Sequence, residues 1–138
     1  MFISVVEIEL PSDVDLDALK DGFHVTAPRY AEVPGLLQKY YCNGAEDQVT
    51  GGVFVWDSLE AAKAGHADPD WRQLINDKYG TEPRVTYFEV PVVVDNVMQK
   101  ILSGEDYLQA VGAHKVRNPS SRNTKQPRES IAKIGEIA

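Results

Sequence analysis

The sequence has little of what several classes of protein require. Its 138 residues include one cysteine, Cys42, so no disulfide can form within the chain. A single Cys and three dispersed His do not supply the four ligands of a structural zinc site, and we expect no metal centre. No apolar run approaches the roughly 20 residues that cross a bilayer, and the first residues do not resemble a signal peptide. We therefore expect a cytoplasmic protein that contacts no membrane.

Basic residues are also scarce. The chain has 14 Lys+Arg against 21 Asp+Glu, a net charge of −7, whereas a nucleic-acid partner requires a basic face, so we expect none. The charge is unevenly spread, because residues 1–96 carry a net −10 and residues 97–138 a net +3. The second part also contains a stretch almost free of large apolar side chains, residues 114–130, which cannot form a core. We divide the chain into a folded module, 1–96, and a C-terminal extension, 97–138.

Alternating and β-branched apolar residues predict four strands in the module, at residues 2–10, 36–43, 50–57 and 84–94. Apolar residues spaced by three and four predict helices between them. The first is capped by Ser12 or Asp13 and breaks near Pro28, and a short one is capped by Ser58 and ends at Gly65. The last is capped by Asp68, with Gly80 as a candidate for its C-terminal cap. The order βαββαβ, with the second helix in two pieces, is typical of a ferredoxin-like α+β fold with a four-stranded antiparallel sheet.

The strands predict what covers this sheet. Large apolar side chains occupy both faces of residues 2–10 and of residues 50–57, whereas a sheet with one face in water is polar on that face. The simplest cover for the second face is the sheet of a second copy, so we expect a homodimer or a higher homo-oligomer.

The extension offers few apolar groups of its own. Its first part has apolar residues spaced by three and four, which predicts one amphipathic helix over residues 96–112, or two short ones broken at Ser103-Gly104. Because the rest is basic and the module acidic, we expect the extension to lie on a partner subunit or on a neighbouring dimer, where it could cover the mouth of a pocket as a lid.

Several segments of the module resemble one superfamily. TAPRYAEVPGLLQKYY at 26–41, GGVFVWDSLEAA at 51–62, DPDWR at 68–72 and YGTEPRVTYFEVPVVVDN at 79–96 resemble dimeric α/β-barrel proteins of the monooxygenase subgroup, which are related to the antibiotic-biosynthesis monooxygenase domain. The resemblance implies a pocket between sheet and helices, in which a small aromatic or polyketide-like substrate is oxidised by O₂ without metal or flavin. Such chemistry needs a deprotonated phenol and donors that hold the anion.

The same superfamily includes haem-degrading enzymes, but their pattern does not match. The resemblance implies that this branch needs three residues: an Asn on the first strand, a Trp on the short helix, and a His on the next helix as the iron ligand. Glu7, Gly65 and Ile75 stand at about those places, and His66 is one position from the Trp site. We expect no haem degradation, and no cofactor.

Two residues are candidates for proton transfer. His24 lies one position from the inner stripe of the first helix, and an imidazole can act as a base near neutral pH. Tyr41 shares a strand face with Asn43, and a phenol and an amide on one face can orient a substrate oxygen, whereas Tyr40 and Cys42 take the opposite face. The alternatives are a hydrogen-bonded boundary residue for His24, cross-strand packing for Tyr41, and a packed free thiol for Cys42.

Other candidates would bind the substrate. Arg29 and Lys39 belong to the resembling motif and could hold an anionic or enolate oxygen, the alternative being salt bridges within an acidic module. Trp71 starts the last helix and Tyr87 lies on the last strand, where both could line the pocket. His66 is expected in a surface turn between helices.

These features leave two classes of function open. The first is an enzyme, a cofactor-independent monooxygenase, or an acid–base isomerase or cyclase that uses the same pocket. The second is a dimeric module that binds a small molecule without catalysis.

Overall fold

The structure, a computed structural model, describes residues 1–117. Its contacts divide the chain into two compact units. The first unit comprises Met1–Val14 and Glu32–Pro91, and the second comprises Asp15–Ala31 together with the segment from Val92 onward. The predicted position of the extension beyond residue 117 lies outside the described residues and stays a prediction.

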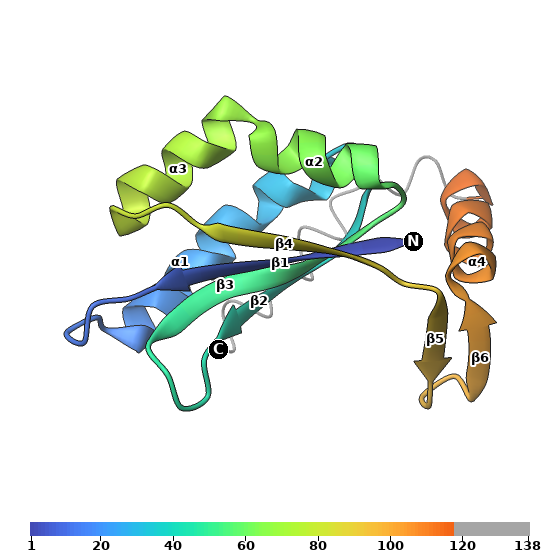
Figure 1. The fold of residues 1–138 in the computed structure, drawn as a ribbon, viewed down its shortest axis with the longest axis horizontal. Coiled ribbons are helices and arrows are strands. Elements are labelled where there is room, and N and C mark those ends of the chain that lie inside the picture. Colours follow the sequence, from blue (N-terminus) through green and yellow to red (C-terminus); the bar gives the residue numbers. More distant parts are fainter. Residues whose placement is uncertain (118–138) are drawn as a thin grey trace. The chain divides into compact units, whose positions relative to one another are not determined.

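The first unit is built on a four-stranded sheet of β1 (Phe2–Glu9), β2 (Leu36–Asn43), β3 (Val49–Trp56) and β4 (Arg84–Glu89). The strand order is β2-β3-β1-β4, and all three pairings are antiparallel (Figure 1). Along the chain the elements follow the order βαββαβ with the second helix in two pieces. The predicted ferredoxin-like α+β fold is therefore confirmed.

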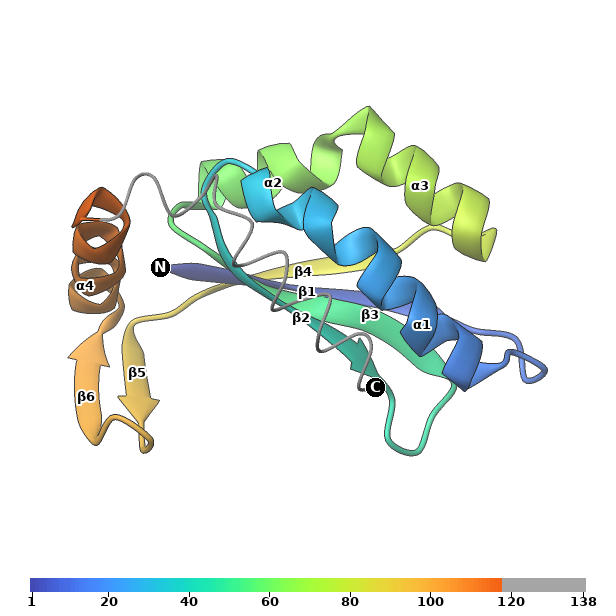
Figure 2. The ribbon, with the colours of Figure 1, turned by 180° about the vertical axis from the view of Figure 1, so that it is seen from behind.

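Two helices of this unit, α2 (Leu59–Ala67) and α3 (Pro69–Tyr79), follow one another along one side of the sheet (Figures 1 and 2). Ser58 caps α2 through its hydroxyl, Asp68 caps α3, and Gly80 ends α3 in the left-handed conformation with φ 68°. These three signals were read correctly from the sequence. However, α2 continues to Ala67, past the Gly65 at which its end was expected.

The core of the unit lies between these helices and the sheet. The even-numbered positions of β1 from Ser4 onward and those of β3 face the helices and are buried, and α2 and α3 add further apolar side chains. The buried apolar residues of this core are Val6, Ile8, Phe54, Trp56, Ala62, Trp71 and Ile75, and Val55 is buried on the opposite face of the sheet. Among them are three polar side chains, Ser4, Thr50 and His66.

The opposite face of the sheet, called here the outer face, carries the odd-numbered residues of β1 and β3. Ile3, Val5 and Val53 are half-buried there, whereas Tyr40 and Phe88 are 53% and 49% exposed. The two-sided apolar pattern that motivated the prediction of a dimer is therefore present in the folded sheet.

The second unit begins with α1 (Leu16–Thr26), which a 3₁₀ turn, η1 (Ala27–Glu32), follows at the predicted break near Pro28. Asp15, rather than Ser12 or Asp13, caps α1, because its carboxylate accepts from the backbone N–H groups of Asp17 and Ala18.

The rest of this unit differs from the sequence prediction. The strand predicted over 84–94 is divided after Glu89, and its last residues belong to β5 (Val92–Asp95), which pairs with β6 (Lys100–Ser103) in a two-stranded hairpin. A helix was predicted over 96–112, but only α4 (Gly104–Arg117), which begins after the hairpin, is helical. The hairpin turns where Asp95 accepts from the Met98 backbone N–H and Gln99 adopts a φ of 54°. Because β5 is a run of valines and pairs locally with β6, β-propensity outweighs the spacing of three and four.

Candidate functional site

Three polar side chains form a buried hydrogen-bonded network inside the first unit. The indole Nε1–H of Trp56 on β3 donates to the hydroxyl of Ser4 on β1 at 2.8 Å, and the same hydroxyl lies 2.7 Å from Nε2 of His66 on α2. Ser4, Trp56 and His66 are each at most 1% exposed. A polar network that is fully removed from water fixes the position of each member, because a lost partner is not replaced by solvent.

His66 reaches this network because α2 lies close to the sheet. A Cβ added to Gly65 would lie 2.5 Å from Cη2 of Trp56, so the glycine allows the indole to pack under the helix. Ala62, one turn before His66 and fully buried, presents the same helix face to the core. The expectation that His66 lies in a surface turn is therefore wrong.

The position of His66 sets its charge. Burial, then the positive charges of Arg72 and Lys39, lower the pKa of His66 from 6.5 to about 4. The imidazole is therefore neutral at pH 7. It can donate one hydrogen bond and accept another, but it is a weak proton acceptor.

Aromatic rings surround the imidazole. The ring centroids of Phe54 and Trp71 lie 4.8 and 4.6 Å from that of His66, both at steep interplanar angles, and Tyr87 lies 6.1 Å away. Trp71 and Tyr87, which the sequence predicted as substrate-binding residues, are thus brought together around a histidine that was predicted to lie in a surface turn.

A cation lies against the aromatic face of β2 and β3. The Nζ atom of Lys39 is 3.7 Å from the ring centroid of Tyr41 and 4.9 Å from that of Phe54, its cross-strand partner. Such cation–π contacts hold the ammonium group in place beside the rings. Lys39 and Tyr41, both predicted as site residues, therefore lie next to the aromatic cluster around His66.

Asn43 lies on the same face of β2 as Tyr41, as predicted, and both are half-buried. Its Oδ1 accepts a 2.9 Å hydrogen bond from the Thr50 hydroxyl on β3, which fixes the amide. The predicted pair of a phenol and an amide on one face is therefore present.

The remaining predicted residues belong to the second unit. His24 is half-buried on α1, and Arg29 is exposed in η1. Their roles in a site stay predictions. Cys42 is a free thiol, but it is exposed on the outer face rather than packed, with Sγ 3.7 Å from the Tyr40 carbonyl oxygen.

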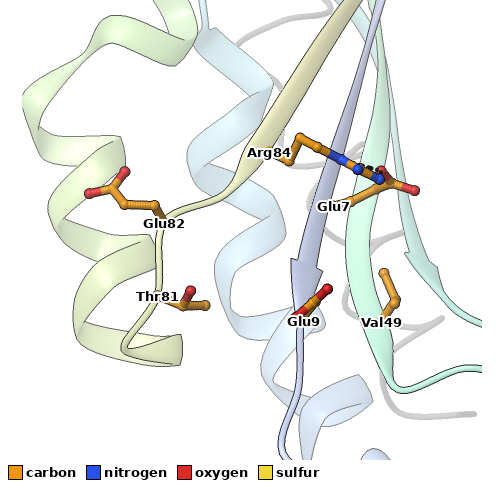
Figure 3. A pocket seen from close by; sticks show the side chains of 6 residues that line it. All are labelled: Glu7, Glu9, Val49, Thr81, Glu82 and Arg84. Atoms are coloured by element: carbon orange, nitrogen blue, oxygen red, sulfur yellow. Dashed lines mark hydrogen bonds and ion pairs between the residues drawn. The ribbon is translucent and has the colours of Figure 1, made fainter.

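Two open hollows on the outer face are formed by residues of the described part of the chain. One, of about 270 Å³, is lined by Glu7, Glu9, Val49, Thr81, Glu82 and Arg84, with an ion pair between Arg84 and Glu7 (Figure 3). The other, of about 190 Å³, lies beside Val5, Cys42 and Gly51. Neither contains a group with a nucleophile-and-base arrangement. Within residues 1–117, no three His, Cys, Asp or Glu side chains are grouped so that they could hold a metal ion.

No helix in the described part of the chain is long and apolar enough to span a bilayer. No family model matches the sequence, and no curated protein matches it.

Solved structures, in contrast, share the fold. A Deinococcus radiodurans protein provisionally named an antibiotic biosynthesis monooxygenase superposes with a TM-score of 0.55 at 18% identity, over 69% of this chain and 97% of its own. The ActVA-Orf6 monooxygenase of Streptomyces coelicolor, solved with nanaomycin D, gives 0.51 at 19%, over 63% and 84%. A mutant of MhuD with two manganese protoporphyrin IX molecules per active site gives 0.56 at 21%, over 70% and 100%. The chain therefore has the fold of the antibiotic-biosynthesis monooxygenase domain.

Proposed function

We propose that this protein is a monooxygenase that oxidises a small aromatic substrate with O₂ and without a cofactor. The observation that carries the proposal is the ammonium group of Lys39 held against the Tyr41 and Phe54 rings, beside the aromatic cluster around His66. Aromatic rings favour a planar apolar substrate, and a cation next to them stabilises the phenolate or enolate into which it must be converted. The monooxygenases that share the fold support this assignment.

The reaction balances without a reductant. A phenol with a free para position reacts with O₂ to give a para-quinone and water: the ring gains one oxygen atom, the other leaves as water, and the substrate supplies all the electrons. The protein has to remove the phenolic proton and hold the resulting anion where O₂ can reach it.

The predicted residues take roles in this reaction. Tyr41 donates its phenolic O–H to the substrate oxygen, and Lys39 stabilises the anion. The predicted base that accepts the phenolic proton is His24, and Arg29 is a second predicted cation; both belong to the second unit. Asn43 orients a substrate oxygen through its amide.

The aromatic side chains take the other role. Trp71 and Tyr87 provide aromatic walls, and both lie beside the His66 ring. The same groups could instead support acid–base isomerisation or cyclisation, or binding without turnover, and these alternatives make different predictions for O₂ uptake.

We also propose that the protein acts as a homodimer whose subunits meet through their outer faces. Tyr40 and Phe88 are about half exposed there, next to the half-buried side chains of Val5 and Val53. A sheet face of this composition is stable in water when a second sheet covers it.

The test measures O₂ uptake with a panel of naphthols and quinols. We expect uptake with at least one of them, and at least a roughly tenfold lower kcat/KM in Lys39→Met, since a charged hydrogen-bond or ion contact in the transition state is worth about 1.5–3 kcal/mol. Lys63→Met, at an exposed position of α2, is the matched control and should keep full activity. Ligand binding without O₂ uptake would favour the binding module, and equal activity of the two lysine variants would remove Lys39 from the site.

A further inference from the structure

One buried atom in the first unit has no hydrogen-bond partner: Nδ1 of His66. Buried polar atoms are paired in the great majority of cases, and an unpaired one costs about 1–3 kcal/mol. The other nitrogen of the same ring is held at 2.7 Å by Ser4, so the histidine is fixed in position with one nitrogen occupied and one open.

Proton accounting decides which nitrogen carries the hydrogen. Trp56 can only donate, so the Ser4 oxygen accepts from the indole, and the Ser4 hydroxyl hydrogen needs an acceptor. The acceptor in contact with the Ser4 oxygen is Nε2 of His66. In the neutral imidazole the hydrogen then resides on Nδ1. The chain of donors runs from Trp56 through Ser4 to His66 and ends in an N–H group without an acceptor.

The surroundings of this N–H group match a planar, electron-rich ligand. The rings of Phe54, Trp71 and Tyr87 lie around the imidazole, and Nδ1 has no hydrogen-bond partner among the described residues. Arg72 and Lys39 place positive charge close enough to affect the imidazole. A neutral donor in a positive, aromatic environment is suited to an anionic or strongly polarised oxygen on an aromatic ring.

We infer that the Nδ1–H group of His66 donates a hydrogen bond to the phenolic oxygen of the substrate, and that Ser4 and Trp56 are positioning residues that hold the imidazole in the donating tautomer. The inference rests on the proposed function, because it assumes a ligand with a phenolic oxygen. Beyond the proposed function, it assigns the hydrogen-bond donor for the substrate to His66, a residue outside the predicted site. It also fixes the direction of the hydrogen bonds from Trp56 to Ser4 and from Ser4 to His66.

Nuclear magnetic resonance tests the inference on the wild-type protein, with 1-naphthol as the ligand and naphthalene as its matched analogue without a hydroxyl. Long-range ¹H–¹⁵N spectra should show a protonated Nδ1 in the free protein, and 1-naphthol, unlike naphthalene, should shift that signal. A protonated Nε2, or no shift of Nδ1 at a concentration of 1-naphthol that saturates binding, would overturn it. A proton signal at Nδ1 that is shifted upfield and stays unchanged by 1-naphthol would also overturn it, because the N–H group would then donate to the π face of the Trp71 ring and not to the ligand.

Substitution provides a second test. His66→Phe keeps an aromatic ring of similar size and removes both nitrogens. It should weaken binding of 1-naphthol about 3- to 10-fold, the range for one neutral hydrogen bond, and leave naphthalene binding unchanged. Ser4→Ala should move the imidazole toward a mixture of tautomers, a spectroscopic change that mere loss of packing does not produce. Equal losses for both ligands would contradict the inference.

The outcomes separate the inference from the proposed function. A specific response of Nδ1 to 1-naphthol without O₂ uptake would keep the donor and reject the oxidase. O₂ uptake that is unchanged in His66→Phe would keep the oxidase and reject the donor.

Discussion

The Trp56 indole donates a 2.8 Å hydrogen bond to the hydroxyl of Ser4, a residue 52 positions earlier in the chain, and both side chains are buried. The hydroxyl in turn contacts His66, so a single oxygen atom joins β1, β3 and α2. Because water cannot reach Trp56 or His66, removal of the Ser4 oxygen would leave both side chains without a hydrogen-bond partner and lower the stability of the fold.

Ser4→Ala should therefore lower the free energy of unfolding by about 2–4 kcal/mol, because it leaves the Trp56 N–H and the His66 Nε2 without partners. Chemical denaturation followed by Trp fluorescence measures the change. Ser12→Ala, at an exposed position, is the control and should stay within about 0.5 kcal/mol of wild type. Equal midpoints for the two variants would show that the network does not stabilise the fold.

Gly65→Ala should destabilise the protein although alanine is the better helix former. In an open helix the substitution gains about 1 kcal/mol, but here the new methyl group would lie 2.5 Å from Cη2 of Trp56. Gly112→Ala in α4 meets nothing within 4 Å and should be neutral or stabilising. Thermal melts should show a lower Tm for Gly65→Ala and an unchanged or higher Tm for Gly112→Ala. A higher Tm for Gly65→Ala would mean that the indole can move away without cost.

Stability should fall when the pH drops below about 6.5. The unfolded chain binds a proton at His66 near 6.5, whereas the folded chain, with the pKa of His66 lowered to about 4, does not. Between these values the unfolded state carries more protons, so the free energy of unfolding decreases by up to about 1.4 kcal/mol per pH unit as the pH falls.

The difference between wild type and His66→Phe isolates this contribution from that of the carboxylates. Urea titrations at pH 7.5, 6 and 5 should show a steeper loss for the wild type than for His66→Phe, whereas His24→Asn, a matched removal of a half-buried histidine, should keep the steep loss. Parallel curves for wild type and His66→Phe would contradict the assignment of a buried neutral imidazole.

Phe88→Glu should dissociate the proposed dimer, since it places a charge on the exposed apolar part of the outer face. Light scattering at micromolar concentration should give about twice 15.3 kDa for the wild type and the monomer mass for the variant. Lys63→Glu, on the helix side of the same unit, should leave the dimer intact. A wild-type protein that is monomeric at this concentration would reject the dimer.

Local signals made much of the fold predictable. β2 has the predicted bounds, Leu36–Asn43, because the pattern of apolar and β-forming residues defines a strand without knowledge of its neighbours. Ser58, Asp68 and Gly80 act as caps for the same reason, since a cap depends on the backbone of the adjacent turn. The face shared by Tyr41 and Asn43 followed from the two-residue period of a strand.

The tertiary structure decided what depends on distant residues. His66 is polar, lies next to a glycine and looks like part of a surface turn, and only its approach to Ser4, 62 residues earlier, makes it a buried group. The hairpin of β5 and β6 replaced an amphipathic helix because pairing between Val94 and Ile101 outweighs a helical spacing that both conformations can satisfy. The sequence by itself determined the order of the elements of the sheet, the bounds of β2 and the caps of α2 and α3, since these depend on neighbouring residues. It did not determine the end of β4, because the strand predicted over 84–94 is divided after Glu89. Which polar side chains meet inside it depended on the packing of strands and helices that are far apart in the chain.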